Sequence, residues 1–156
     1  PVYLQRIAQL TNKSNQFNLT TLRCTEDDIR AMAADDRYVT LSGRLADKFA
    51  DNGVVSVVAA QQDGQTLHIR LWLMSCRVLK RGMEDAMMDV LMDQAAGRGV
   101  KTVMGYYYPT AKNAMVKDFY AGMGFAQVSG DADGNTVWSL SVEDYKPRRP
   151  HMIIER

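Results

Sequence analysis

The sequence predicts a single α/β domain in which helices cover both faces of a mixed β-sheet. Segments with apolar residues at helical spacing alternate along the chain with β-branched or alternating segments, an order typical of such a sheet. The 156 residues contain no internal repeat, low-complexity segment or interior linker. With 46% apolar and 24% charged residues, the chain has the composition of one globular core.

The first part of the chain is predicted to hold two helices and one strand. The elements are a lead-in helix over Val2–Leu10, an amide-rich connector (TNKSNQFN), a strand around Leu19–Arg23 and a helix ending near Ala34. Thr25 followed by Asp28 has the spacing of a capping box, which places the start of the second helix.

Three strands follow. They are predicted over Arg37–Arg44, Val54–Ala60 and Thr66–Cys76, with turns at Asn52–Gly53 and Asp63–Gly64. The third strand alternates regularly. One face is predicted to carry Leu67, Ile69, Leu71 and Leu73, and the other His68, Arg70, Trp72, Met74 and Cys76.

The last part of the chain completes the sheet. A helix is predicted from Met83 to about Ala96, ended by Gly97 and Gly99, and it is followed by a strand over Lys101–Tyr107. The next helix, Asn113–Met123, has an inner face of Val116, Phe119, Tyr120 and Met123. Gly124–Ser129 and Thr136–Ser141 form the last hairpin, and residues 146–156 form a tail without a clear period.

Composition excludes several classes of function. Nineteen basic against eighteen acidic residues give no electrostatic argument for a nucleic-acid partner. Two cysteines and two histidines, without metal-ligand spacing, predict neither a disulfide framework nor a metal site. The mainly apolar stretch Val54–Ala60, interrupted by Ser56, is far shorter than the roughly 20 residues that span a bilayer. No membrane partner is expected, and a reducing cytoplasm fits best.

Two stretches, RVLKRGMED and KNAMVKDFYAGMGF, resemble the GCN5-related N-acetyltransferase (GNAT) fold. The resemblance implies a turn over Arg77, Val78, Arg81 and Gly82 that binds coenzyme A pyrophosphate at a helix N-terminus. It also implies that Asn113 contacts the pantetheine region and that Tyr120 protonates the departing thiolate.

The cofactor turn departs from the family's pattern at two positions. Leu79 and Glu84 stand where the family usually has Arg or Gln and Gly or Ala, and only Gly82 fits. Glu84 would place a carboxylate in the first helical turn, where it competes with a pyrophosphate for the same amides. The sequence therefore predicts a degenerate coenzyme A site.

A narrower resemblance covers almost the whole chain. The stretches RIAQLTNKSNQFNLTTLR, LADKFADNGVV, MSCRVLKRGME and PTAKNAMVKDFYAGMGF look like the C-terminal part of FkbH-like proteins of methoxymalonyl and glyceryl extender-unit biosynthesis in polyketide pathways. This resemblance implies an acyltransferase that loads a glyceryl group onto the phosphopantetheine of an acyl carrier protein. The phosphatase half typical of that family, which is HAD-like with a D-x-D-x-T motif, is not found in these 156 residues and is an expected partner.

Cys76 is the candidate nucleophile, because thiolates exchange thioesters readily. Arg77, Lys80 and Arg81 would favour its thiolate. The alternative is a free cysteine that packs as a small hydrophobe. His68 lies eight residues away on the same strand, roughly 26 Å at about 3.3 Å per residue, so the two cannot form a dyad.

Tyr120 and Asn113 also have simpler interpretations. Tyr120 can be a core aromatic residue, and Asn113 can cap the last helix. Two further functions stay open for the chain: an acetyl-CoA-dependent N-acetyltransferase acting on a small amine, and a non-catalytic docking module for a carrier protein.

Overall fold

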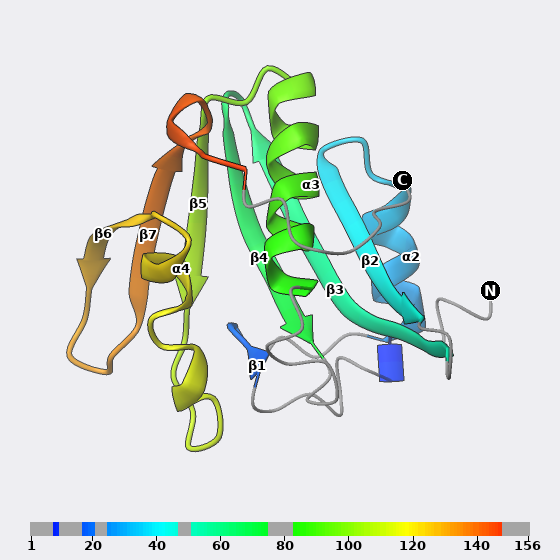
Figure 1. Ribbon diagram of the computed structural model, residues 1–156, viewed down its shortest axis with the longest axis horizontal. Helices are drawn as coiled ribbons and strands as arrows, with labels where there is room; N and C mark the ends of the chain where they lie inside the picture. Colours follow the sequence, from blue (N-terminus) through cyan, green and yellow to red (C-terminus); the bar gives the residue numbers. More distant parts are fainter. Residues whose placement is uncertain (1–7, 10–16, 21–24, 47–50, 75–82, 148–156) are drawn as a thin grey trace.

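The computed structural model describes residues 8–9, 17–20, 25–46, 51–74 and 83–147 (Figure 1). The strands are β1 (Phe17–Asn18), β2 (Tyr38–Ala46), β3 (Asp51–Asp63), β4 (Thr66–Met74), β5 (Thr102–Tyr107), β6 (Ala126–Gly130) and β7 (Thr136–Ser141). The helices are α2 (Glu26–Ala34), α3 (Met83–Gly97) and α4 (Phe119–Gly122), with the 3₁₀ turns η2 (Ala114–Val116) and η3 (Val142–Asp144). The predicted single α/β domain is confirmed for the described residues.

The described strands form one mixed sheet with the order β2-β3-β4-β5-β7-β6, and β1 pairs with β4 outside this path. All pairs are antiparallel except β4 and β5, which run parallel. The parallel pair is the place where a helical crossover is needed, and α3 supplies it.

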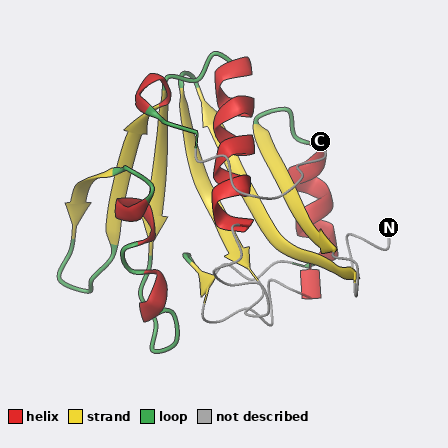
Figure 2. Ribbon diagram, viewed as in Figure 1, coloured by secondary structure: helices red, strands yellow, loops and turns green. Residues whose placement is uncertain are grey.

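Helices cover both faces of the sheet, as predicted. Figure 2 shows α3 and α4 in front of the strands and α2 behind them. The larger core lies on the α3 face, where Met88 and Leu91 of α3 pack with Trp72 and Tyr120. The smaller core lies on the α2 face, where Ile29 packs with strand residues such as Leu71.

α2 begins where the sequence predicts. The Thr25 hydroxyl accepts a hydrogen bond from the Asp28 amide at 3.1 Å, and the Asp28 carboxylate accepts one from the Thr25 amide at 2.9 Å. This reciprocal capping box satisfies two amide groups that the first helical turn otherwise leaves without partners.

The predicted faces of β4 are wrong in one respect. Ala59 pairs with Leu71 and Ala60 with Ile69, so Arg70 is an extra residue in β4. Such a β-bulge reverses the alternation of all side chains beyond it. The four leucine and isoleucine positions predicted to share a face are therefore divided. Leu67 and Ile69 lie in the larger core, together with Trp72 and Met74, while Leu71 and Leu73 lie in the smaller one.

Several predicted boundaries are also corrected. The turn expected at Asn52–Gly53 lies inside β3, which begins at Asp51. The helix expected over Asn113–Met123 is divided into η2 and α4. Of the strand expected around Leu19–Arg23, Leu19 and Thr20 form a bend directly after β1, and the rest lies outside the described residues. Most of the lead-in helix lies outside the described residues, although residues 8–9 are helical.

Candidate functional site

β4 and β5 diverge soon after they begin to pair. Their parallel pairing covers only Thr66–His68 of β4 and Thr102–Met104 of β5. The bulge at Arg70 follows directly after this paired stretch. The hypothesis of an FkbH-like acyltransferase places a phosphopantetheine arm between these two strands. The residues beside the point where the strands diverge therefore determine what can bind there.

The segment Phe17–Thr20 of the chain itself bridges the diverging ends of the two strands, and Figure 1 shows β1 between them. The Leu19 amide donates to the Trp72 carbonyl at 3.1 Å, and the Tyr108 amide donates to the Leu19 carbonyl at 2.8 Å. The Thr20 hydroxyl donates to the Arg70 carbonyl at 2.9 Å. Much of the free edge of β4 beyond His68 is therefore hydrogen-bonded to this segment.

Tyr120 lies beside the divergence, in the larger core. Its ring packs directly against Gly105 of β5, where a Cβ atom would stand 2.5 Å from the ring carbons. The phenol is 1% exposed, and its hydroxyl makes no hydrogen bond of ordinary geometry with any described residue. Burial raises the pKa of Tyr120 far above its ordinary value, while the Tyr106 backbone amide acts in the opposite direction. The hydroxyl is therefore protonated at neutral pH and can donate a hydrogen bond.

Two further buried polar atoms without a hydrogen-bond partner among the described residues are Trp72 Nε1 and Glu84 Oε2. Trp72 contacts Phe119 edge-on at 5.0 Å between ring centroids, which places it close to α4. Glu84 stands in the first turn of α3. Burial raises the pKa of Glu84, and the hydrogen bond to its own backbone amide lowers it. The sequence predicts a pyrophosphate at this helix N-terminus, and a carboxylate in the first turn opposes its binding.

Asn113 is fully buried, and the chain itself uses its side chain. The two Nδ2 hydrogens point to the Asn18 and Tyr108 carbonyls, each at 2.9 Å. Oδ1 accepts from the Thr110 amide at 2.7 Å and from the Tyr107 hydroxyl at 3.3 Å. The expected helix cap is not formed by this side chain. Asn113 instead joins β1 to the loop after β5, and a contact with pantetheine would have to break these bonds.

The other predicted site residues cannot be placed. Cys76 and the cofactor-turn residues lie outside the described residues; the latter are Arg77, Val78, Leu79, Lys80, Arg81 and Gly82. Their assigned roles stay predictions.

A polar cluster that the sequence does not predict lies on the face of the sheet opposite Tyr120. His68 Nδ1 and the Tyr106 hydroxyl are 2.6 Å apart, and the Arg70 guanidinium lies 5.6 Å from the centre of the Tyr106 ring. Arg70 Nε also donates to Gln61 Oε1 at 3.3 Å. The sequence gives no local signal for this cluster, since His68 and Tyr106 are 38 positions apart.

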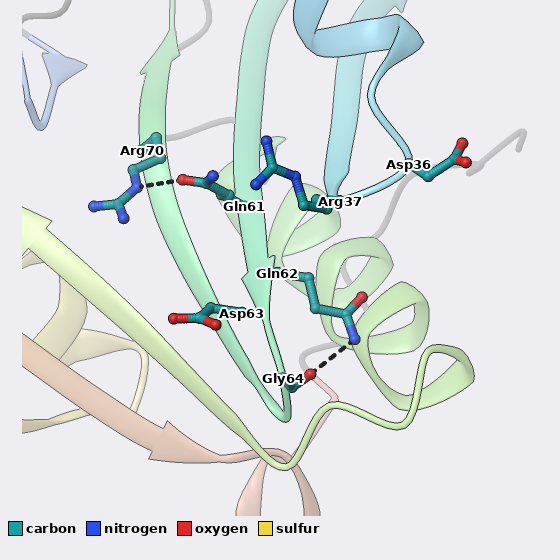
Figure 3. A pocket seen from close by; sticks show the side chains of 7 residues that line it. All are labelled: Asp36, Arg37, Gln61, Gln62, Asp63, Gly64 and Arg70. Atoms are coloured by element: carbon teal, nitrogen blue, oxygen red, sulfur yellow. Dashed lines mark hydrogen bonds between the residues drawn. The ribbon is translucent and has the colours of Figure 1, made fainter.

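A cavity of about 630 Å³ adjoins this cluster. It is lined by Asp36, Arg37, Gln61, Gln62, Asp63, Gly64 and Arg70. Figure 3 shows Arg70, Gln61 and Arg37 side by side across three strands, with Asp63 nearby and Asp36 turned away. Arg37 is paired with Asp35 at 3.0 Å, so its charge is balanced from outside the cavity.

Two absences hold for the described part of the chain. No group of three or more histidine, cysteine, aspartate or glutamate residues there has the arrangement of a metal site. None of the helices in these ranges is both long and apolar enough to cross a membrane.

Comparison with solved structures identifies the fold. The chain is similar to the ribosomal-protein-S18-alanine N-acetyltransferase from Escherichia coli, with 15% identity and a TM-score of 0.66 over 90% of this chain and 88% of that one. It is also similar to Rv2747 from Mycobacterium tuberculosis, solved in complex with CoA and NLQ, with 15% identity and a TM-score of 0.68 over 90% and 94% of the two chains.

A third similar structure is the GNAT domain of S. lividans PAT, with 16% identity and a TM-score of 0.67 over 88% of this chain and 84% of that one. No family model matches the sequence, and the search of curated proteins found no match. The protein therefore has the GNAT fold, as the sequence predicts, and these low identities show the fold alone.

Proposed function

We propose that the protein is an acyltransferase that handles a thioester beside the divergence of β4 and β5. The observation that carries this proposal is the Tyr120 hydroxyl, which is buried, protonated and, among the described residues, without a hydrogen-bond partner of ordinary geometry. A buried hydroxyl normally has a hydrogen-bond partner, because leaving it unpaired costs about 1–3 kcal/mol. A departing thiolate beside Tyr120 would accept a hydrogen bond from its hydroxyl and supply the missing partner.

We further propose that the thiol that accepts the acyl group belongs to the phosphopantetheine of an acyl carrier protein, in a glyceryl-loading role like that of FkbH-like proteins. Glu84 favours this over free coenzyme A. A half-buried carboxylate in the first turn of α3 weakens the helix dipole where a pyrophosphate would bind. A carrier protein also binds through its own surface, so its affinity depends less on the amides of this turn.

Cys76 is the proposed nucleophile of this reaction. Its thiolate would attack the carbonyl carbon of the incoming acyl donor, form the new bond to sulfur and release the donor's leaving group. Transfer to the carrier protein would then break that bond and regenerate the thiol. The HAD-like phosphatase half, the expected partner, would act on the phosphorylated donor.

The alternative is a GNAT N-acetyltransferase that uses acetyl-CoA and a small amine. The fold itself favours this alternative, since the similar structures include an N-acetyltransferase and a protein solved in complex with CoA. A third function, a docking module without chemistry, would keep carrier-protein binding and lose nothing when Cys76 is replaced.

Calorimetric titration distinguishes the first two functions. The full chain is titrated with acetyl-CoA and, separately, with a phosphopantetheinylated carrier protein. Binding of the carrier protein with little or no acetyl-CoA binding supports the proposal. Tight acetyl-CoA binding overturns the interpretation of Glu84 and favours the alternative.

Substitutions then test the chemistry. Tyr120→Phe keeps the ring and removes the hydroxyl, so we expect binding to persist while acyl transfer falls by about 100-fold or more. Tyr38→Phe, on β2, is the matched control and should leave transfer unchanged. Cys76→Ala separates catalyst from docking module, because only a catalyst loses turnover with its binding intact.

A further inference from the structure

The His68–Tyr106 pair lies on the face of the sheet opposite the Tyr120 side chain. Along β5, Gly105 faces the larger core and contacts the Tyr120 ring, so the next residue, Tyr106, faces the other way. Tyr106 is half-buried there, beside the bulge at Arg70 and the cavity that Arg70 lines. The backbone of Tyr106 also influences Tyr120. The side chains of Tyr106 and Tyr120 thus lie on opposite faces of the sheet at nearly the same position along β5.

The protons of the pair can be assigned from its surroundings. Burial, followed by the charge of Arg70, lowers the pKa of His68, and Asp63 acts weakly in the other direction. Burial raises the pKa of Tyr106, against the effect of Arg70. At neutral pH the imidazole is therefore uncharged and the phenol protonated. Either group can then donate in the 2.6 Å hydrogen bond, and we assign the phenol as the donor to Nδ1, with the ring proton on Nε2.

None of the other described titratable groups near His68 takes the place of Tyr106 as its hydrogen-bond partner. The groups that face His68 are Asp63 of β3, Arg70 of its own strand, and Tyr106 of β5. Gln61 and Met104 stand opposite it on the neighbouring strands and do not titrate. Arg70 extends over the Tyr106 ring and holds the phenol against the sheet, while its Nε is fixed by Gln61.

We propose that Tyr106 and His68 form a proton relay that deprotonates the nucleophile that accepts the acyl group. The proton of the acceptor, a thiol or an amine, passes to the Tyr106 oxygen as the Tyr106 proton passes to His68 Nδ1. The acceptor then forms its bond to the acyl carbon as the bond from that carbon to the donor's sulfur breaks and the thiolate departs. The imidazolium gives one proton to solvent and returns to the tautomer that carries its proton on Nε2. The acceptor approaches through the cavity beside Arg70. This inference rests on the proposed acyltransferase function.

The first test needs no acyl transfer. Nitrogen chemical shifts of the His68 ring, measured by NMR across pH, report which nitrogen carries the proton. We expect an unprotonated Nδ1 at pH 7 and a midpoint below 6.5, the ordinary histidine value. Tyr106→Phe keeps the ring under Arg70 and should shift both the Nδ1 signal and the midpoint, whereas Tyr108→Phe should shift neither. A protonated Nδ1 in the wild type overturns the relay.

The second test measures transfer to a carrier-protein thiol and to a small amine. We expect Tyr106→Phe to slow transfer by about 100-fold or more with whichever acceptor the wild type uses. His68→Gln keeps a hydrogen-bond acceptor that cannot hold the proton, so it should be equally slow. Its rate should also lack the decline that the wild type shows as pH falls below 6.5.

The outcomes separate the two proposals. Full activity of His68→Gln would mean that His68 only positions Tyr106, and the relay fails. Normal transfer by Tyr106→Phe also overturns the relay, while the acyltransferase function stands. A wild type that transfers to neither acceptor overturns the proposed function and the relay with it.

Discussion

The contact between Gly105 and Tyr120 allows a sharp test of the site. In Gly105→Ala the new Cβ atom would stand 2.5 Å from two carbons of the Tyr120 ring, whereas ordinary contacts begin near 3.4 Å. The ring would have to retreat by about 0.9 Å, the difference between these two distances. It cannot do so freely, because Phe119 and Phe125 pack against it with centroids 5.3 and 5.1 Å away.

Overpacking of a well-packed core costs about 1–3 kcal/mol, and the rigid surroundings place this variant near the upper end. For a domain of this size, 1 kcal/mol corresponds to roughly 2–4 °C in Tm, so we expect a loss of about 5–10 °C. Urea unfolding and calorimetry measure both quantities. Tyr120 should also be displaced, so acyl transfer should fall more than stability alone explains.

A double-mutant cycle tests the assigned cause. In a Tyr120→Leu background the ring is gone, and Gly105→Ala should then cost less than about 1 kcal/mol. Gly97→Ala is the matched control. Gly97 ends α3 with nothing within 4 Å of its Cβ position, so alanine there should be neutral or stabilising by about 0.4–1 kcal/mol. An equal cost of Gly105→Ala in both backgrounds would refute the steric explanation.

Two further predictions concern buried polar groups. Asn113→Ala leaves the Asn18 and Tyr108 carbonyls and the Thr110 amide without their present partner, so we expect the free energy of unfolding in urea to fall by about 2–4 kcal/mol. The control is Lys112→Ala, an exposed neighbour that should change the stability little. A loss under about 1 kcal/mol for Asn113→Ala would contradict its bridging role. The pKa of Glu84 is raised in the folded state, so the unfolded chain ionises first and stability falls as pH rises above 4.5. Glu84→Gln should therefore stabilise the protein at pH 7 more than at pH 4, whereas the exposed Glu143→Gln should not, and a gain independent of pH would exclude burial of the charge as the cause.

Much of the fold could be predicted because its signals are local. The Thr25 and Asp28 pair marks the start of α2, and the Asp63–Gly64 turn marks the β3–β4 hairpin. The bulge at Arg70 could not be predicted, since one extra residue in a strand has no local signal and is set by pairing with β3. The same extra residue reversed the predicted faces of the second half of β4.

The site was only partly predictable, for a similar reason. The neighbours of Tyr120 in the sequence identify it as a candidate, but only the three-dimensional structure shows that its hydroxyl has no ordinary hydrogen-bond partner among the described residues. The sequence excludes His68 as the catalytic partner of Cys76, because the two residues are too far apart along one strand to form a dyad. Its actual partner, Tyr106, lies on the adjacent parallel strand. Gly105 did carry a signal, since a glycine inside a strand often marks the close approach of another group.

The position of Phe17–Thr20 determines how a thiol arm can reach Tyr120. Leu19 is completely buried in the larger core, and the carbonyl of the equally buried Asn18 is held by Asn113. Exposing a side chain such as Leu19 costs about 1.5–3 kcal/mol before any hydrogen bond is broken. Displacement of this segment by a ligand is therefore unfavourable. We expect an arm to pass beside it and to end near Arg70 and Tyr106, between the two phenols that flank the sheet.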